Sequence, residues 1–270
     1  MKTLASLATL MALLSLGLSA GPLAAPAPVK ACAAKPVVVL VHGAWAGTSS
    51  WTGVLERLQQ QGYVVRAYAN PLRGLTGDAA DLAAFLKTLD GPIVLVGHSY
   101  GGSVITNAAA NDPDVKQLVY VDAAAPAVGE NTGQLSGRTS ALGADPATLY
   151  DQVPNGVDPE LYLKKAVFLK SFGPDLPGPV AGGLWAGQRP AAKSAFTTPS
   201  KAAAWRTIPS WYVIGTADRI ITPESQRAMA SRAHAKVLDV PGGSHLTLIS
   251  QPQPVADQIL AAAEATCPPS

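Results

Sequence analysis

The chain has 270 residues, of which 48% are hydrophobic and 14% are charged, and its formal net charge is +2. This composition supplies enough apolar residues for a sizeable core and excludes an intrinsically disordered chain. Because Lys and Arg form no cluster, binding to nucleic acid or to an acidic membrane surface is not expected. The length predicts one large domain, with room for an insertion.

The first 27 residues predict a signal peptide that does not belong to the folded domain. Lys2 provides a charged start, and residues 4–18 form an apolar stretch that is too short to cross a membrane. Small residues from Ser19 to Ala27 offer several cleavage sites, so the position of the cut stays open. The pattern favours a secreted or periplasmic protein without stable membrane insertion over an uncleaved membrane anchor.

The two cysteines, Cys32 and Cys267, stand on either side of the expected fold. In an oxidising compartment they can form a disulfide that ties the termini together, and their even number fits this interpretation. Attachment of a lipid at Cys32 is the alternative, although Lys30 makes the preceding residues a poor acylation signal. The cysteines lack the spacing of metal ligands and no nucleotide-binding motif occurs, so we expect neither a metal nor an organic cofactor.

Strand and helix patterns alternate over the first half of the domain. Apolar runs at residues 37–41, 64–69, 93–96 and 118–121 predict buried strands, and helical patterns at 50–61, 76–89 and 103–110 separate them. This order predicts an α/β fold with a mostly parallel sheet of about six strands and helices on both faces. We assign residues 28–125 and 208–270 to this core.

The loop after the first strand reads His42-Gly43-Ala44-Trp45-Ala46-Gly47. Gly43 lacks a Cβ, so another part of the backbone can approach it closely. We interpret His42 as a residue that shapes this turn rather than one that titrates. Trp45 is either a wall of the substrate pocket or an aromatic side chain packed under a cap, and both interpretations stay open.

The strand at residues 93–96 runs into Gly97-His98-Ser99-Tyr100-Gly101, which matches the nucleophile elbow G-x-S-x-G. The flanking glycines allow the tight turn that lifts the Ser99 hydroxyl above the edge of the sheet. The backbone N–H of Tyr100 lies at a helix N-terminus, where negative charge is favoured. Ser99 is therefore the predicted nucleophile, and the N–H groups of Ala44 and Tyr100 are the predicted oxyanion hole.

Residues 126–207 break the alternation and are rich in Gly, Pro and Ala. Their clearest helical pattern spans residues 158–169, and a weaker one spans 190–204. An insertion between two strands of the sheet, above the elbow, predicts a cap over the substrate site. Its aromatic residues, Trp185 among them, are candidates either for a pocket wall or for the core of the cap itself.

Two aspartates are candidates for the acid that orients the catalytic base. Asp218 follows the apolar strand at residues 211–214 and precedes the histidine, in the chain order Ser…Asp…His. Asp122 ends the strand at residues 118–121 and is the alternative acid. Its alternative interpretation is the cap of a turn.

The base should be one of four histidines, and each has a different setting. His98 adjoins the nucleophile and should project away from it, whereas His234 lies at the basic end of a predicted helix. His245 follows a late strand on the glycine-rich loop Pro241-Gly242-Gly243-Ser244 and can swing over the elbow. His245 is therefore the predicted base, and Leu246 beside it is a candidate pocket residue.

Several motifs resemble the α/β-hydrolase superfamily over residues 36–265. They are Leu40-Val41-His42-Gly43-Ala44-Trp45, Ile208-Pro209-Ser210-Trp211-Tyr212, Ala217-Asp218-Arg219 and Ser244-His245. Within the superfamily they are similar to bacterial members of the branch that holds plant methyl-ester esterases and hydroxynitrile lyases. The resemblance implies that Ser99, Asp218 and His245 form a catalytic triad.

Two positions separate this chain from the lyases of that branch. The lyases carry a threonine where this chain has Gly43, and a lysine where it has Leu246. Without that lysine there is no cation to hold a leaving cyanide, so the esterase interpretation is favoured. We expect a serine esterase that acts on a small-molecule ester, whose identity the cap decides. A lactonase, an acyltransferase, an amidase or a ligand-binding protein without activity are the alternatives, and the oligomeric state stays open.

Overall fold

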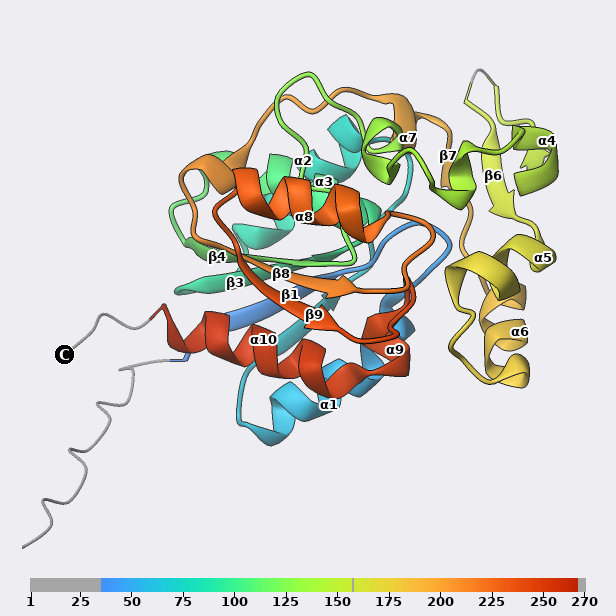
Figure 1. Ribbon diagram of the computed structural model, residues 1–270. Coiled ribbons are helices and arrows are strands. Elements are labelled where there is room, and N and C mark those ends of the chain that lie inside the picture. Colours follow the sequence, from blue (N-terminus) through green and yellow to red (C-terminus); the bar gives the residue numbers. More distant parts are fainter. Residues whose placement is uncertain (1–34, 157, 267–270) are drawn as a thin grey trace, which may run out of the picture. The chain divides into compact units, whose positions relative to one another are not determined.

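The computed structural model describes residues 35–156 and 158–266. Six parallel strands form the central sheet in the order β2-β1-β3-β4-β8-β9 (Figure 1). They are β1 (Val37–Val41), β2 (Val65–Tyr68), β3 (Ile93–His98), β4 (Val115–Val121), β8 (Ser210–Gly215) and β9 (Lys236–Val240). The predicted α/β fold with about six strands is confirmed. The predicted signal peptide, Cys32 and Cys267 lie outside the described residues, so the leader and the disulfide stay predictions.

Helices cover both faces of the sheet (Figure 1). One face carries α1 (Thr52–Gln60) and α10 (Pro252–Glu264), and the other carries α2 (Leu75–Leu86), α3 (Tyr100–Ala108) and α8 (Pro223–Arg232). Short helical turns complete the core at Thr48–Trp51, Ala109–Asn111, Ala204–Arg206 and α9 (Thr247–Ser250). None of the helices between residues 35 and 266 is long and apolar enough to cross a membrane.

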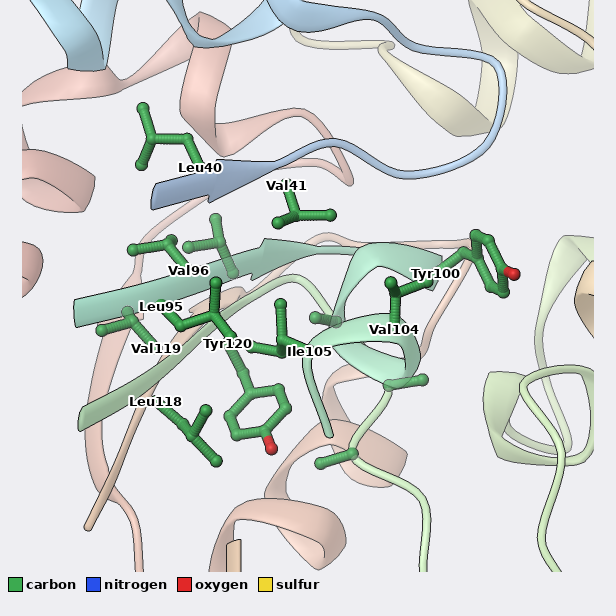
Figure 2. Packing of buried hydrophobic residues seen from close by; sticks show 14 of the residues in the cluster. Leu40, Val41, Leu95, Val96, Tyr100, Val104, Ile105, Leu118, Val119 and Tyr120 are labelled. Atoms are coloured by element: carbon green, nitrogen blue, oxygen red, sulfur yellow. The ribbon is translucent and has the colours of Figure 1, made fainter. Parts of the chain in front are cut away.

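The core is built from β-branched and leucine side chains of the central strands. Figure 2 shows Val41 of β1, Val96 of β3 and Val119 of β4 among the side chains that pack with Ile105 of α3. Every residue of β3 is buried. Because a parallel sheet is covered on both faces, its strands are apolar without alternation, which explains the uninterrupted runs in the sequence.

The segment between β4 and β8 contains the predicted cap and forms a small antiparallel sheet of its own. Its strands are β5 (Tyr150–Val153), β6 (Glu160–Leu163) and β7 (Ala191–Ala192). Short helices accompany them: α4 (Pro146–Leu149), α5 (Lys165–Val167), the π-helical turn η5 (Phe168–Phe172), α6 (Gly178–Ala186), α7 (Ser194–Thr197) and the turns Gly133–Ser136 and Ala141–Gly143.

The predicted helices at residues 158–169 and 190–204 are wrong in large part. Residues 160–163 form a strand in which Leu161 and Leu163 are buried and their neighbours are partly exposed. Within the second segment only residues 194–197 are α-helical, and a short helical turn begins at Ala204. Residues 160–163 pair with β5 and with residues 191–192, and this pairing overrides the local helical preference.

The sheet order brings two predicted loops together. β1 lies between β2 and β3, so the chain turns in opposite directions when it leaves β1 and β3. Ligands of open α/β sheets bind at such a switch point, beyond the carboxyl ends of the strands. The loop after Val41 therefore lies beside the elbow after His98.

Candidate active site

The elbow holds Ser99 in a strained backbone conformation. Its φ of 54° and ψ of −124° are unfavourable for a residue with a side chain. The glycines after it allow this turn, since a Cβ on Gly101 would lie 2.5 Å from the carbonyl oxygen of Val41. A Cβ on Gly102 would lie 2.4 Å from the oxygen of Ala124. The local pattern thus folds the serine against the neighbouring strand.

The structure brings Ser99, His245 and Asp218 into one hydrogen-bonded chain. The distance from Ser99 Oγ to His245 Nε2 is 2.8 Å, and His245 Nδ1 lies 2.8 Å from Asp218 Oδ2. All three residues are buried, with Ser99 6% exposed. A base that touches the hydroxyl, itself oriented by a carboxylate, is the arrangement that activates a serine for attack.

The carboxylate of Asp218 is held by its own turn. Its Oδ1 accepts hydrogen bonds from the N–H groups of Ile220 at 2.7 Å and Ile221 at 3.1 Å. Its Oδ2 accepts from Gln226 Nε2 at 2.8 Å as well as from His245. Only two oxygens serve four donors, so the orientation of the carboxylate is fixed.

Asp122, the alternative acid, is buried close to the triad but bonds elsewhere. Its Oδ1 accepts from the N–H of Gly215 at 2.8 Å, and its Oδ2 accepts from the N–H and the hydroxyl of Thr247. Burial, assisted by the negative charge of Asp218, raises the pKa of Asp122 to about 7. Asp122 therefore ties the loop before Asp218 to the loop after His245, while Asp218 contacts the imidazole.

The backbone N–H groups of Ala44 and Tyr100 lie where the sequence places an oxyanion hole. Gly43 packs against the nucleophile, since a Cβ there would lie 2.6 Å from Ser99 Cβ. Within the described part of the chain, neither amide has a hydrogen-bond acceptor. Both residues are buried, so their N–H groups remain available to a bound group.

His42 shapes the oxyanion loop. Its Nε2 accepts hydrogen bonds from the N–H of Asn70 at 3.1 Å and from the Arg189 guanidinium at 3.0 Å, so its proton is on Nδ1. Nδ1 then donates to the carbonyl oxygen of Gly43 at 2.9 Å. Burial lowers the pKa of His42 to about 4, which keeps the ring neutral. The Gly43 carbonyl and the N–H of Ala44 belong to one trans peptide, in which C=O and N–H point in opposite directions. The hydrogen bond from His42 holds the carbonyl oxygen on its own side, so the Ala44 N–H points away from His42.

The side chains beside the nucleophile point away from the reacting atoms. The Tyr100 hydroxyl donates to Asp78 Oδ2 at 2.6 Å and anchors the start of α3 to α2. His98 Nε2 donates to the carbonyl oxygen of His245 at 2.8 Å and steadies the loop of the base. The sequence indicated that His98 faces away from Ser99, but nothing local to it pointed to this bond.

A cavity of about 360 Å³ lies beside the triad. Leu246 and Trp45 line it, and the Phe172 ring, also in its wall, lies 5.0 Å from the His245 ring. Trp45 also stacks on Tyr150 of the cap, so it both lines the cavity and packs under the cap. The remaining lining residues are Ala46, Gly47, Thr48, Ser49, Ser50, Ala69, Phe168, Gly183, Leu184, Gly187, Arg189 and Ile249.

Trp185 does not line this cavity, contrary to expectation. Its indole Nε1 donates to the carbonyl oxygen of Leu163 at 3.0 Å, and its ring faces a separate hollow of about 420 Å³ in the cap. Neighbouring residues of a helix point about 100° apart. Leu184 therefore reaches the cavity from α6 while Trp185 faces β6.

No cluster of His, Cys, Asp and Glu that could hold a metal occurs in the part of the chain that the structure describes. Asn70 and Gln226 were not anticipated from the sequence, whereas Arg189 was one of two cap cations, with Lys193, that the sequence offered either for a substrate carboxylate or for a solvated face. Each reaches the site from a distant segment of the chain, and no local sequence motif predicts its position there. The catalytic roles of the predicted residues stay proposals, developed below.

Comparisons with known proteins place this geometry in a family. The sequence pattern of the alpha/beta hydrolase family matches residues 38–258. The chain is 34% identical over 106 residues to a carbendazim hydrolyzing esterase of Nocardioides sp. (strain SG-4G), an alignment that spans 34% of this chain and 44% of that protein. It is 27% identical over 233 residues to the alpha/beta hydrolase nvfD of Aspergillus novofumigatus (strain IBT 16806), which spans 74% of this chain and 85% of that protein.

A solved structure shows the same fold. The crystal structure of polyneuridine aldehyde esterase superposes with a TM-score of 0.72 at 18% identity, over 84% of this chain and 99% of that one. The family match covers most of the described chain, and the predicted resemblance is confirmed. The protein belongs to the alpha/beta hydrolase family.

Proposed function

We propose that the protein is a secreted or periplasmic serine hydrolase that cleaves carboxylic esters through an acyl-enzyme intermediate. The observation that carries the proposal is the hydrogen-bonded chain from Ser99 through His245 to Asp218, beside the N–H groups of Ala44 and Tyr100, which have no acceptor among the residues that the structure describes. A relative named as an esterase supports the same chemistry.

The reaction begins at the Ser99 hydroxyl. His245 Nε2 takes the proton of the hydroxyl while Ser99 Oγ attacks the ester carbonyl carbon, and Asp218 stabilises the imidazolium that forms. The carbonyl oxygen becomes an oxyanion that accepts from the N–H groups of Ala44 and Tyr100. Preformed donors of this kind are worth roughly 3–4 kcal/mol each.

The second half of the reaction frees the enzyme. His245 passes its proton to the leaving alcohol, and the bond between the carbonyl carbon and the alcohol oxygen breaks. Water then attacks the acyl group on Ser99, with His245 again as the base, and the acid is released. The cavity beside the triad is the proposed place for one arm of the ester.

Other functions remain open on the same fold. A lactonase, an amidase or an acyltransferase would use the same nucleophile on a different acyl donor or acceptor. A ligand-binding protein without turnover would also fit the cavity. The aligned hydrogen bonds of the triad favour a catalyst, because binding alone does not require them.

The test is turnover of 4-nitrophenyl esters from acetate to decanoate by the mature protein from about Pro28 onward, beside Ser99→Ala. We expect steady release of nitrophenol that the variant loses, with a chain-length optimum set by the cavity. A stoichiometric burst without turnover would favour an acyltransferase or a binding protein. Ligand-induced thermal stabilisation that persists in Ser99→Ala, without product, would favour a binding protein.

Export and the disulfide have their own measurement. Intact mass of the exported protein should show loss of the leader and the mass of a Cys32–Cys267 bridge, and reduction should lower the melting temperature. A retained leader, or a lipid on Cys32, would contradict this part of the proposal.

A further inference from the structure

We propose that Arg189 forms an anion-binding subsite in the cavity beside the triad, and that the preferred esters carry a carboxylate. This inference rests on the proposed esterase function and narrows its substrate class. It concerns a cap residue that bears no part of the catalytic triad.

Arg189 lines the cavity, and the other lining residues that the structure describes are all neutral. The rest of the wall consists of apolar side chains, glycines and the hydroxyl residues Thr48, Ser49 and Ser50. No carboxylate among residues 35–156 and 158–266 lies within salt-bridge distance of Arg189. A partly buried cation without a counter-ion is complemented by an anionic ligand.

The position of Arg189 is fixed by two hydrogen bonds with the oxyanion loop, and its side chain passes beside Gly47. Its backbone oxygen accepts from the N–H of Trp45 at 3.1 Å, and its Nη1 donates to His42 Nε2 at 3.0 Å. Its Cδ lies 3.7 Å from the position that a Cβ on Gly47 would take. The guanidinium is thus held beside the loop that supplies the Ala44 N–H.

Most of the donor capacity of Arg189 is not used within the described chain. A guanidinium has five N–H donors in a planar fork, and one of them bonds to His42. His42 is neutral, because burial holds its pKa near 4, so this bond leaves the charge of Arg189 uncompensated. The remaining fork matches the two oxygens of a carboxylate.

The oxyanion loop connects Arg189 to the nucleophile. Arg189 contacts His42, and Gly43, which follows His42, packs on Ser99. We infer that an anion held by Arg189 belongs to the same small molecule as the ester that Ser99 attacks. A half-ester of a dicarboxylic acid places it on the acyl arm, and an ester of a hydroxybenzoate places it on the alcohol arm.

The experiment compares matched pairs of substrates that differ only in charge. The acyl arm is tested with 4-nitrophenyl hydrogen glutarate and adipate, each beside its methyl ester, after subtraction of spontaneous hydrolysis. The alcohol arm is tested with 4-butyryloxybenzoate beside its methyl ester. In at least one arm we expect kcat/KM for the charged member to exceed that for the neutral one by about tenfold or more.

Three variants separate charge recognition from structure. Arg189→Met should collapse the preference toward unity, whereas Arg189→Lys should keep part of it because the charge remains. Lys193→Met is the matched control, since Lys193 is an exposed cation of the cap that does not line the cavity. The control should keep the full preference.

A binding measurement keeps this inference separate from the proposed function. Titration of Ser99→Ala with monomethyl glutarate and with dimethyl glutarate should show tighter binding of the anion, lost in Ser99→Ala/Arg189→Met. If no ester is turned over but this difference is found, the esterase proposal fails and the subsite stands. Equal treatment of charged and neutral members in every arm and in binding, or a preference that survives Arg189→Met, overturns the inference.

Discussion

The carboxylate of Asp218 determines which ring nitrogen of His245 carries the proton, and Asp218→Asn tests this role. In the variant, the amide oxygen has to stay on the N–H groups of Ile220 and Ile221, which only an acceptor can satisfy. The amide NH₂ then faces His245 Nδ1 and Gln226 Nε2. A donor at Nδ1 forces the imidazole proton onto Nε2. A protonated Nε2 can no longer accept the proton of Ser99.

The expected loss in kcat is about 10⁴-fold, which corresponds to roughly 5.5 kcal/mol at the transition state. Substrate binding should change little, because Asp218 does not line the cavity. The assay is kcat and KM on the best 4-nitrophenyl ester, with the melting temperature as a check on folding.

Asp122→Asn is the matched control for this substitution. It makes the same chemical change in a second buried aspartate, but the oxygens of Asp122 bond to Gly215 and Thr247 rather than to the imidazole. We expect it to retain activity within about tenfold, since the tautomer of His245 is untouched. The reasoning is refuted if Asp122→Asn is as damaging as Asp218→Asn, or if Asp218→Asn keeps most of the activity.

Three further predictions concern stability. Tyr100→Phe removes a hydrogen-bond donor from the buried Asp78, so it should lower the free energy of unfolding by about 1–3 kcal/mol and leave kcat/KM nearly unchanged. Lost activity at an unchanged melting temperature would instead place the hydroxyl in the active site. Gly102→Ala should destabilise the fold by roughly 1–3 kcal/mol or more, because its Cβ would meet a backbone oxygen 2.4 Å away. Gly182→Ala should not, because no atom lies within 4 Å of the position of its Cβ. Similar thermal melts for the two variants would contradict this reasoning. Folding raises the pKa of Asp122 from 3.8 to about 7. The contribution of its protonated carboxyl group to the free energy of unfolding is therefore fully present below pH 3.8 and is lost as the pH rises through 7. Wild type should lose roughly 4 kcal/mol relative to Asp122→Asn over that window, and urea unfolding that shows a pH-independent difference would disprove it.

The proposed nucleophile, Ser99, could be found from sequence because the requirements of the elbow are local. A buried strand, a serine between glycines and a following helix occupy one short stretch, and the steric demands of the elbow leave few other residues possible there. The parallel sheet was predictable for a similar reason, since strands covered on both faces are apolar throughout.

The cap was much less predictable. β6 pairs with β5 and with residues 191–192, some thirty positions along the chain. Its apolar residues fit a helix or a strand equally well in isolation, and the partners decided between them. Trp185 was a pocket candidate as an aromatic residue of the cap, but the direction in which α6 turns its faces places it against β6.

The sequence by itself determined the fold class and pointed to the proposed nucleophile and to a histidine and an aspartate after it in the chain, because each of these depends on residues adjacent in the chain. Only the tertiary structure decided that Asp218 rather than Asp122 contacts His245, since both aspartates end strands at the same edge of the sheet. It also decided that His42 receives a hydrogen bond from Arg189, 147 residues away. Such contacts depend on how the cap packs on the sheet. This packing is the sum of many side-chain contacts, and it produces no recognisable pattern in any single segment of the sequence.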